Sequence, residues 1–360
     1  MRHEVLIIGG GLSGLSLLRQ LRGVGCDARL LEARDRLGGR IKAWQFGGQS
    51  FDLGPAWFWP EQPRIRALVK ELGLRSFMQW SDGAQCFEDS RGRIERWAGM
   101  APMAGSLRLA GGLSALIHAL AAALPADAVR LNAKVDTLER EAEGITARVG
   151  NKSYSARQVV IASPPRVIAT TVEFVPALPA EVAQVLGAVP TWMAGQAKVL
   201  ALYERPFWRN AGLSGDAMSH LGPMVEIHDA SPLEGAPYAL FGFVGVPAAA
   251  RRDKDRLLSG AQAQLRRLFG PEAGEPIAMT LKDWAWDTST ATERDLKPMR
   301  SHPTYGRPAL LNGLWDGRLH FAGTEVAESF GGFLEGALSA AEATFSDLTE
   351  GLQNGARQTV

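Results

Sequence analysis

The stretch VLIIGGGLSG, residues 5–14, decides the fold of this chain. Its first four residues are apolar and mostly β-branched, as expected of a buried parallel strand. Gly9, Gly11 and Gly14 then follow in the pattern GxGxxG. In such a turn the first glycine permits a tight bend, the second lets the backbone approach a pyrophosphate, and the third lets helix and strand pack closely. We therefore predict a dinucleotide-binding turn between a strand and a helix.

The residues that follow complete a βαβ unit. Leu15, Leu18 and Leu21 recur at helical spacing, and ARLLE at residues 28–32 is a second apolar strand that ends in an acid. The helix N-terminus would offer N–H donors to phosphates, and Glu32 would accept hydrogen bonds from a ribose diol. This complete unit indicates a dinucleotide site rather than a flexible surface turn. It leaves open whether the dinucleotide is NAD or FAD.

Composition bounds the class of protein. A chain of 360 residues suggests two domains, and its formal net charge of +1 gives no general attraction to nucleic acid or anionic membranes. Cys26 and Cys86 lie far apart without a CxxC spacing, so neither a disulfide framework nor a metal site is indicated. No apolar run approaches the roughly 18 residues of a membrane-spanning helix. We expect a cytoplasmic protein with no bound metal, no nucleic-acid partner and no membrane span.

Segments at both ends of the chain carry a resemblance to a known family. EARDRLGGR at residues 32–40 extends the ribose-binding acid, HFAGTE occupies residues 320–325, and GGFLEGA occupies residues 331–337. Together they resemble the flavin-dependent amine oxidase superfamily, in a short form similar to monoamine oxidases. The resemblance implies an α/β fold, namely an FAD-binding, Rossmann-like two-dinucleotide-binding-domain fold with an inserted α+β substrate domain.

The resemblance also implies how the chain is divided. Because the first fifty and the last forty residues would bind one FAD, the FAD-binding domain must be discontinuous. We expect it to comprise residues 1–75, 106–168 and 310–350. Residues 76–105 and 169–309 would then form the substrate domain.

The resemblance assigns cofactor contacts residue by residue. Glu32 would hold the adenosine ribose, Arg34 would lie beside the adenosine, and Arg40 would contact the pyrophosphate, which suits its planar fork. The backbone of Val135 would meet adenine, and an N–H of Leu334 would face the flavin pyrimidine. No cysteine lies between Trp284 and Phe333, so the FAD is expected to be non-covalent. The complete cofactor set is Gly9, Gly11, Gly14, Glu32, Arg34, Gly39, Arg40, Val135, Gly323, Glu325 and Leu334.

A third segment supplies the candidate catalytic residues. GQAKVLALYERPFWR at residues 195–209 resembles the monoamine oxidase strand in which a lysine reaches the flavin N5 edge through water, and Lys198 matches that lysine. Strand alternation puts Lys198 on one face with Leu200 and Leu202. Burial there would lower its pKa and equip it for proton exchange near N5 and for assisting oxygen.

The resemblance is weakest around the aromatic cage that encloses the amine in monoamine oxidases. Phe333 takes the place of one cage tyrosine, and a poorly matched alignment puts Arg294 near the other. Trp57 falls where an aromatic residue approaches flavin and substrate. The expected catalytic set is therefore Lys198, Phe333 and Trp57.

Other elements follow from local patterns. We predict a helix over Gly111–Leu124, a strand over Val129–Leu138 and a strand over Gln158–Ala162. Apolar residues at helical spacing predict an amphipathic helix with a basic outer face. They are Leu257, Ala261, Leu265 and Leu268.

The resemblance favours an enzyme that oxidises a small-molecule amine to an imine at its C–N bond, with oxygen or another acceptor reoxidising the flavin and, for oxygen, releasing hydrogen peroxide. An FAD-dependent desaturase or oxidoreductase acting on a C–C or C–O bond is an alternative, since that branch shares the terminal segments. A flavin-binding scaffold without turnover is a second alternative, and a plain NAD-binding protein a third. The substrate and the oligomeric state stay open.

Overall fold

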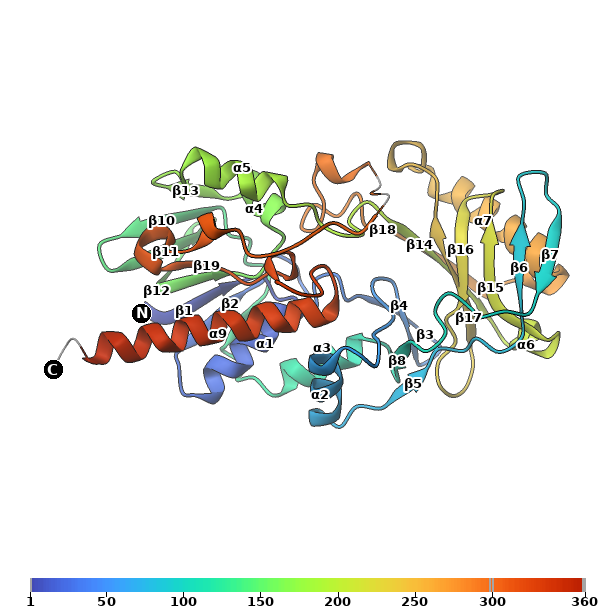
Figure 1. Ribbon diagram of the computed structural model, residues 1–360, viewed down its shortest axis with the longest axis horizontal. Coiled ribbons are helices and arrows are strands. Elements are labelled where there is room, and N and C mark those ends of the chain that lie inside the picture. Colours follow the sequence, from blue (N-terminus) through green and yellow to red (C-terminus); the bar gives the residue numbers. More distant parts are fainter. Residues whose placement is uncertain (1, 298, 300, 358–360) are drawn as a thin grey trace.

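Two β-sheets lie in opposite halves of an elongated molecule (Figure 1). The structure is a computed structural model that describes residues 2–297, 299 and 301–357. The N-terminus and the C-terminal helix lie at the same end, beside the first sheet (Figure 1). The two ends of the chain therefore belong to the same half of the molecule.

The first sheet is mixed, and its centre is parallel. β1 pairs in parallel with β2 on one side and with β12 on the other, and β12 pairs in parallel with β19. The strands, in spatial order, are β13 (Glu173–Val175), β10 (Thr137–Glu141), β11 (Gly144–Val149), β12 (Lys152–Ile161), β1 (Arg2–Ile8), β2 (Ala28–Leu31) and β9 (Val129–Arg130), with β19 (Leu319–Phe321) beside β12.

Both faces of the first sheet are covered. Val5 and Ile7 of β1 pack on one face, and Leu6 and Ile8 pack on the other. The first face is covered by α1 (Leu12–Gly23), α2 (Pro63–Glu71), α3 (Ser114–Ala122) and α9 (Leu334–Arg357). The second face carries α4 (Pro165–Thr171), α5 (Ala180–Ala188), η4 (Ala309–Leu311) and α8 (Leu314–Gly317). This burial on both sides explains why residues 5–8 form an uninterrupted apolar run.

One face of the second sheet is turned toward the first sheet, and its other face packs on two helices. Its strands, in spatial order, are β18 (Ala278–Asp283), β14 (Ala197–Tyr203), β17 (Tyr238–Val244), β16 (Met224–Asp229), β15 (Leu213–Ser219), β6 (Ala84–Glu88) and β7 (Ile94–Trp97). The outer face packs on α6 (Phe207–Asn210) and α7 (Lys254–Phe269). Leu200 and Leu202 of β14 lie on the inner face with Phe51 and Leu53. Ala197, Val199 and Ala201 lie on the outer face, so the predicted alternation of this strand is confirmed.

Short elements connect these parts. The hairpin of β3 (Ala43–Phe46) with β4 (Gln49–Asp52) and the pair of β5 (Ser76–Met78) with β8 (Leu107–Leu109) lie between the sheets. The remaining 3₁₀ turns are η1 (Ala248–Ala250), η2 (Pro271–Gly274), η3 (Glu293–Asp295) and η5 (Thr324–Val326). Within the described residues, no helix combines the length and the apolar character needed to cross a membrane.

Most local predictions are confirmed, but the strand predicted over Val129–Leu138 is wrong. The helix predicted over Gly111–Leu124 is α3, the strand over Gln158–Ala162 is the end of β12, and the amphipathic helix is α7. The chain leaves the sheet after β9 because Asn132 adopts a left-handed conformation (φ 53°), and its N–H donates to the Arg34 carbonyl. It rejoins the sheet as β10, on the far side of β12.

Residues 173–188 pack with the first sheet, although they were predicted to belong to the substrate domain. β13 pairs with β10 of the first sheet, and α5 packs on the first sheet through Val182 and Leu186. Residues 173–188 therefore belong structurally with the first sheet rather than with the substrate domain. We propose moving that boundary to about residue 189, and the rest of the division stays a prediction.

Gly14 should be sensitive to any side chain. A Cβ added at Gly14 would collide with the Gly9 carbonyl oxygen, whereas one added at Gly23, in the same helix, meets no atom within 4 Å. Gly14→Ala is expected to lower the free energy of unfolding by about 1–3 kcal/mol and to weaken FAD binding. Gly23→Ala, the control, should change stability by no more than about 1 kcal/mol. Thermal unfolding and FAD titration test this, and equal behaviour of the two variants would contradict it.

Candidate active site

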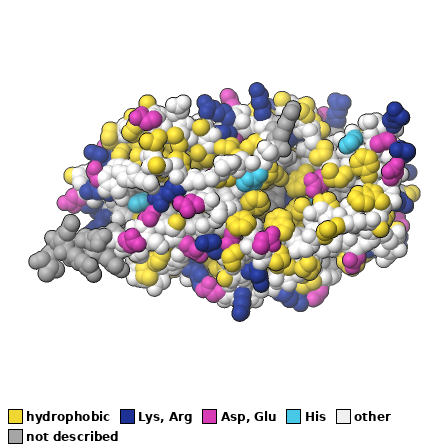
Figure 2. Space-filling model, viewed as in Figure 1, with side chains coloured by type: hydrophobic (Ala, Val, Ile, Leu, Met, Phe, Trp, Pro, Cys, Tyr) yellow, Lys and Arg dark blue, Asp and Glu magenta, His cyan; other side chains and the backbone are white. Residues whose placement is uncertain are grey.

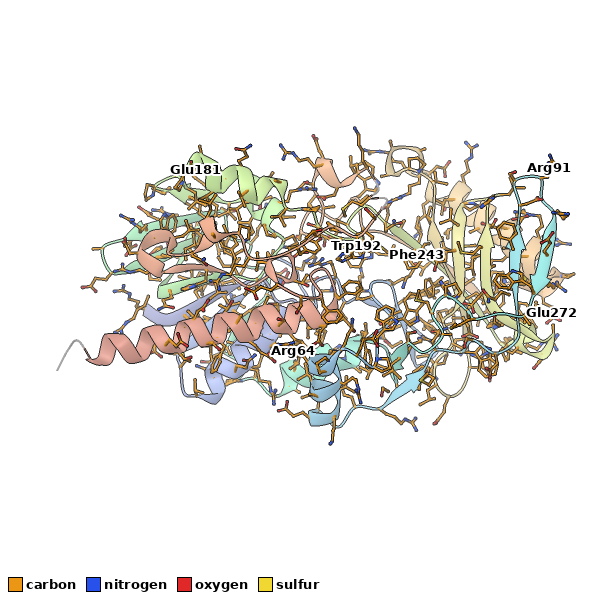
Figure 3. The ribbon with its side chains drawn as sticks, viewed as in Figure 1. Arg64, Arg91, Glu181, Trp192, Phe243 and Glu272 are labelled. Carbon is orange, nitrogen blue, oxygen red and sulfur yellow. The ribbon has the colours of Figure 1, made fainter. Side chains whose placement is uncertain are left out.

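A cavity of about 530 Å³ lies where the two sheets face each other. On the face drawn in Figure 2 the surface is hollowed between the two halves, with hydrophobic side chains around the hollow. Trp192 and Phe243, which line the cavity, lie between the halves in Figure 3. Most of the predicted site residues line it, namely Gly9, Gly11, Glu32, Arg34, Gly39, Arg40, Trp57, Lys198, Gly323, Phe333 and Leu334.

The glycine turn leaves space where the prediction requires it. Gly11 lines the cavity, and a Cβ added at Gly11 would meet no protein atom within 4 Å. Gly39 has a φ of +56°, and its Cβ would come within 3.3 Å of the Gly11 Cα. The first turn of α1 begins at this point, so its free N–H groups and its partial positive charge face an open space. This arrangement suits a pyrophosphate.

Glu32 is buried and held by the backbone. Its Oε2 accepts a hydrogen bond from the Gly10 N–H at 2.7 Å, and its Oε1 accepts one from the Arg34 N–H at 2.9 Å. The Arg34 guanidinium donates to Asp287 and, at 2.8 Å, to Thr290 Oγ1. These contacts fix a carboxylate and a guanidinium at the edge of the cavity, where a ribose and an adenine were predicted.

Arg40 and Glu325 join the two ends of the chain across the site. Arg40 Nη2 lies 2.7 Å from Glu325 Oε1, and the Glu325 side chain is fully buried. Neither Glu325 oxygen makes a well-aligned hydrogen bond with the described residues. Glu325 itself does not line the cavity, so it acts on the site through Arg40.

The start of α9 closes the opposite side of the cavity. Thr324 Oγ1 donates to the Phe333 carbonyl and accepts from the Gly332 N–H, both at 2.9 Å. The helix begins at Leu334, and Phe333, Leu334 and Ala337 line the cavity. The N–H groups of a first helical turn lack partners within the helix, so they are available to a bound group.

These features fit an FAD. The open space above Gly11, the anchored Glu32, the exposed part of Arg40 and the free first turn of α9 border one continuous cavity. Gly14 is not part of its lining, because it packs helix against strand. Val135 is also outside the lining and packs in the core of the first sheet, so its predicted contact with adenine stays a prediction.

Lys198 is buried and reaches into the cavity from β14. Its Nζ donates hydrogen bonds to the carbonyl oxygens of Gly54 at 2.7 Å and Asp52 at 3.2 Å. It also lies 4.1 Å from the centroid of the Phe241 ring. The ammonium is therefore fixed by two carbonyl groups and an aromatic face, with its side chain only slightly exposed to the cavity.

The electrostatics around Lys198 favour its neutral form. Burial lowers its pKa to about 7, with the nearby Arg108 acting in the same direction and Asp52 opposing it. Burial also raises the pKa of the Asp52 carboxyl to about 6, against the charges of Arg108 and Lys198 and a hydrogen bond from the Leu113 N–H. The predicted lowering of the Lys198 pKa is confirmed, and the side chain can gain or lose a proton near neutral pH.

Aromatic side chains form one wall of the cavity. The Trp57 indole N–H donates to Gln79 Oε1 at 2.8 Å, which fixes the ring. Trp57 packs against Phe241 and Phe243, with ring centroids 5.2 and 6.4 Å away. Trp57 and Phe243 thus line the cavity together with Lys198.

The placement predicted for Arg294 is wrong. Arg294 lies on η3 and donates to the Gly187 carbonyl at 3.0 Å, and it does not line the cavity. A capping box between Thr292 and Asp295 fixes η3 and turns residue 294 outward. The ring stacked on Phe333 is that of His302, with centroids 5.0 Å apart and planes at 22°.

Sequence reasoning also missed a cluster of ionisable side chains that borders the cavity. Glu226 lines the cavity, and His228 lies behind it, hydrogen-bonded to both Glu226 and Asp216. The alternation of Glu226 and His228 along β16 was a visible signal, since residues two positions apart in a strand share a face. Their pairing with Asp216 could not be read from local sequence.

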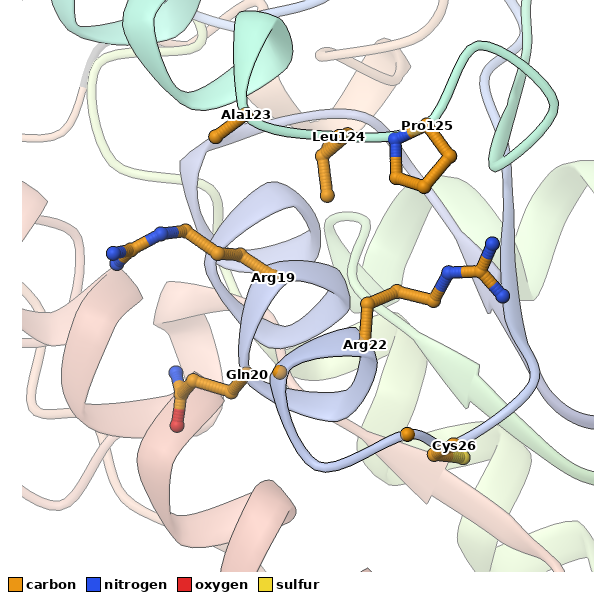
Figure 4. Close-up of a pocket in the computed structure, with 9 residues that line it drawn as sticks. Arg19, Gln20, Arg22, Cys26, Ala123, Leu124 and Pro125 are labelled. Atoms are coloured by element: carbon orange, nitrogen blue, oxygen red, sulfur yellow. The ribbon is translucent and has the colours of Figure 1, made fainter.

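A second groove lies on the outside of α1 (Figure 4). Arg19 and Arg22 border it, but Arg19 pairs with Glu71, and Arg22 lies near Asp27 and Asp127. Cys26 also borders this groove, and burial raises the pKa of its thiol to about 12. The groove therefore offers neither a free cation nor a reactive thiolate. Among the described residues, no group of three or more potential ligands is placed to hold a metal ion.

Comparison with known proteins agrees with this geometry. The model of the family described as flavin containing amine oxidoreductase matches residues 12–102 and 94–344. A probable flavin-containing monoamine oxidase A of Dictyostelium discoideum is 23% identical, and the match covers 98% of each chain.

Solved structures show the same fold. A cyclohexylamine oxidase from Brevibacterium oxydans IH-35A superposes with a TM-score of 0.84 at 21% identity, covering 98% of this chain and 100% of that one. A wild-type putrescine oxidase bound to putrescine superposes with a TM-score of 0.81 at 21% identity, covering 97% and 99%. The predicted α/β fold class is confirmed.

The buried charge of Lys198 should make stability depend on pH. An unfolded lysine keeps its ordinary pKa of 10.5, so between about 7 and 10.5 the unfolded chain binds more protons than the folded one, and stability rises with pH there. Lys198→Met removes this dependence. The free energy of unfolding of Lys198→Met should therefore exceed that of the parent protein. This difference should be largest at about pH 7 and below, and should shrink as the pH rises.

Urea unfolding of the FAD-saturated proteins over this pH range measures the difference. Lys70→Met, on the exposed side of α2, is the control and should show no such trend. A Lys198→Met gain that is constant or grows with pH would contradict the placement of a buried, titrating ammonium.

Proposed function

Because this chain belongs to the family of flavin-containing amine oxidoreductases, we propose that it oxidises the C–N bond of a small amine to an imine, which water then hydrolyses. Relatives named as monoamine, putrescine and cyclohexylamine oxidases support an amine as substrate, although they differ in the amine that they name. The observation that carries the proposal is Lys198, a buried amine poised near neutrality in a cavity whose far end is built for a dinucleotide.

FAD would be held by the glycine turn, Glu32, Arg34, Arg40 and the first turn of α9. When bound, FAD would supply the hydride acceptor for the amine α-carbon and a route for the electrons to oxygen. The partial positive charge of the α9 N-terminus would stabilise negative charge on its reduced ring by about 0.3–2 kcal/mol.

The side chains of this chain would position the amine and manage protons. Trp57 and Phe333, which both line the cavity, would confine the substrate and exclude water. Lys198 would hold or release a proton at Nζ, which the carbonyl groups of Asp52 and Gly54 keep in place. Among the described residues, the cavity lining holds no histidine, so positioning rather than imidazole acid–base chemistry would carry the reaction.

Anaerobic mixing of the holoenzyme with a panel of primary amines tests the proposal. We expect at least one amine to bleach the absorption of the oxidised flavin, because its α-carbon delivers two electrons. Once oxygen is admitted, we expect one molecule of hydrogen peroxide for each flavin that was reduced. Alcohols and alkene precursors of matched size are the controls. Bleaching by these controls but by no amine would favour a desaturase or C–O oxidoreductase. No bleaching by any compound would favour a flavin-binding scaffold.

The FAD is proposed to be non-covalent. Neither cysteine lines the cavity, since Cys26 lies by the outer groove of α1 and Cys86 packs in the core of the second sheet. Acid precipitation of the holoenzyme should therefore leave the flavin in the supernatant and a colourless protein pellet. Flavin that stays in the pellet after washing in denaturant would show a covalent bond.

A further inference from the structure

Three strands place Lys198 and Glu226 in one row across the inner face of the second sheet. Lys198 of β14 pairs with Phe243 of β17, and Phe243 pairs with Glu226 of β16. Adjacent strands are about 4.8 Å apart, so the two backbones are roughly 10 Å apart. In the next row, Phe241 pairs with His228. The catalytic candidate and the carboxylate thus lie on the same wall, separated by one aromatic residue.

His228 holds Glu226 in place from behind. The His228 ring is fully buried, with Nδ1 2.6 Å from Asp216 Oδ1 and Nε2 2.7 Å from Glu226 Oε1. Burial by itself lowers the pKa of this imidazole, but the hydrogen bonds and charges of the two carboxylates raise it above its ordinary value. Two carboxylates around one imidazole leave the cluster negatively charged whether or not the ring is protonated, so it can attract one more cation.

Glu226 has an oxygen to spare. Its side chain is 28% exposed, and only Oε1 has a hydrogen-bond partner among the described residues. Glu32, the other carboxylate lining the cavity, uses both oxygens on backbone N–H groups. A glutamate needed only to satisfy His228 would have no reason to face the cavity.

Two aromatic residues lie close to the Glu226–His228 pair. Phe243 is the direct cross-strand neighbour of Glu226, and the Trp57 ring stands edge-on to His228 at 5.1 Å between centroids. Both Trp57 and Phe243 line the cavity with Glu226. A carboxylate beside aromatic faces is the environment that an alkylammonium group prefers, since charge pairing and cation–π attraction add together.

We infer that Glu226, oriented by His228 and Asp216, is a subsite for a second cationic group of the substrate, and that the preferred substrates are amines with a further ammonium several bonds from the oxidised carbon. This inference rests on the proposed amine oxidation. Glu226 touches the substrate, whereas His228 is a positioning residue.

Paired substrates test the subsite. Anaerobic flavin reduction by the holoenzyme is measured with α,ω-diamines of four to eight carbons and with n-alkylamines of the same lengths. The parent should prefer the best diamine over its matched monoamine by about tenfold or more in kcat/KM, the effect expected of one charge-assisted hydrogen bond. Glu226→Gln should remove this preference, by lowering kcat/KM for the diamine about tenfold more than kcat/KM for the monoamine.

Two further variants control for folding and charge. Glu181→Gln removes one negative charge on exposed α5, far from the cavity (Figure 3), and should keep the diamine preference. Glu226→Asp keeps the carboxylate and should retain part of the preference. A parent without diamine preference, or a Glu226→Gln variant that lowers diamine and monoamine equally, would overturn the inference.

A cation without a nitrogen lone pair separates the subsite from the reaction. Butyltrimethylammonium cannot be oxidised as an amine, and calorimetry with the holoenzyme should show binding that Glu226→Gln weakens by about threefold or more, through loss of charge attraction alone, because this cation has no N–H donor. If no amine reduces the flavin but this loss is seen, the proposed function fails and the subsite stands. If amines reduce the flavin and Glu226→Gln leaves both cation binding and substrate preference unchanged, the proposed function stands and the subsite is overturned.

Discussion

The site depends on two strand pairings, those of β12 with β1 and with β19. Because all three strands run in parallel, the turn after Ile8 and the turn after Phe321 emerge at the same edge of the first sheet. The glycine turn and the start of α9 therefore face one cavity although they are more than three hundred residues apart in sequence. The Arg40–Glu325 ion pair links the segment after β2 to the turn after Phe321.

Charged groups buried beside the inner face of the second sheet come at some expense to stability. Lys198, Asp52 and Arg108 are all buried, and taking such charges out of water is unfavourable unless partners offset it. The carbonyl oxygens around Lys198 and those of Ala230 and Ser231 around Arg108 offset part of that penalty. The part of the penalty that is not offset lowers the pKa of Lys198 to near neutrality, which a role in proton transfer requires.

Local patterns predicted the parts of this structure that local forces determine. The glycine turn and the strand alternation at Lys198 each depend on neighbours in sequence, whereas the segment at the start of α9 was recognised only by its resemblance to the family. The break after Arg130 depends on the left-handed Asn132, whose amide is tied to Arg34, and no periodicity reports such a contact. Arg294 was misplaced because a weak alignment gave its position, and the link of His228 to Asp216 is a cross-strand contact that only the fold creates.

The central claim is that both ends of this chain hold one FAD whose flavin ring lies between the first turn of α9 and Lys198. A crystal structure of the purified holoenzyme measures this most directly. The account predicts one FAD, its pyrophosphate against the glycine turn after Ile8, its ribose at Glu32 and its ring facing the inner side of the second sheet. A different nucleotide there, or a flavin bound outside this cavity, would contradict it.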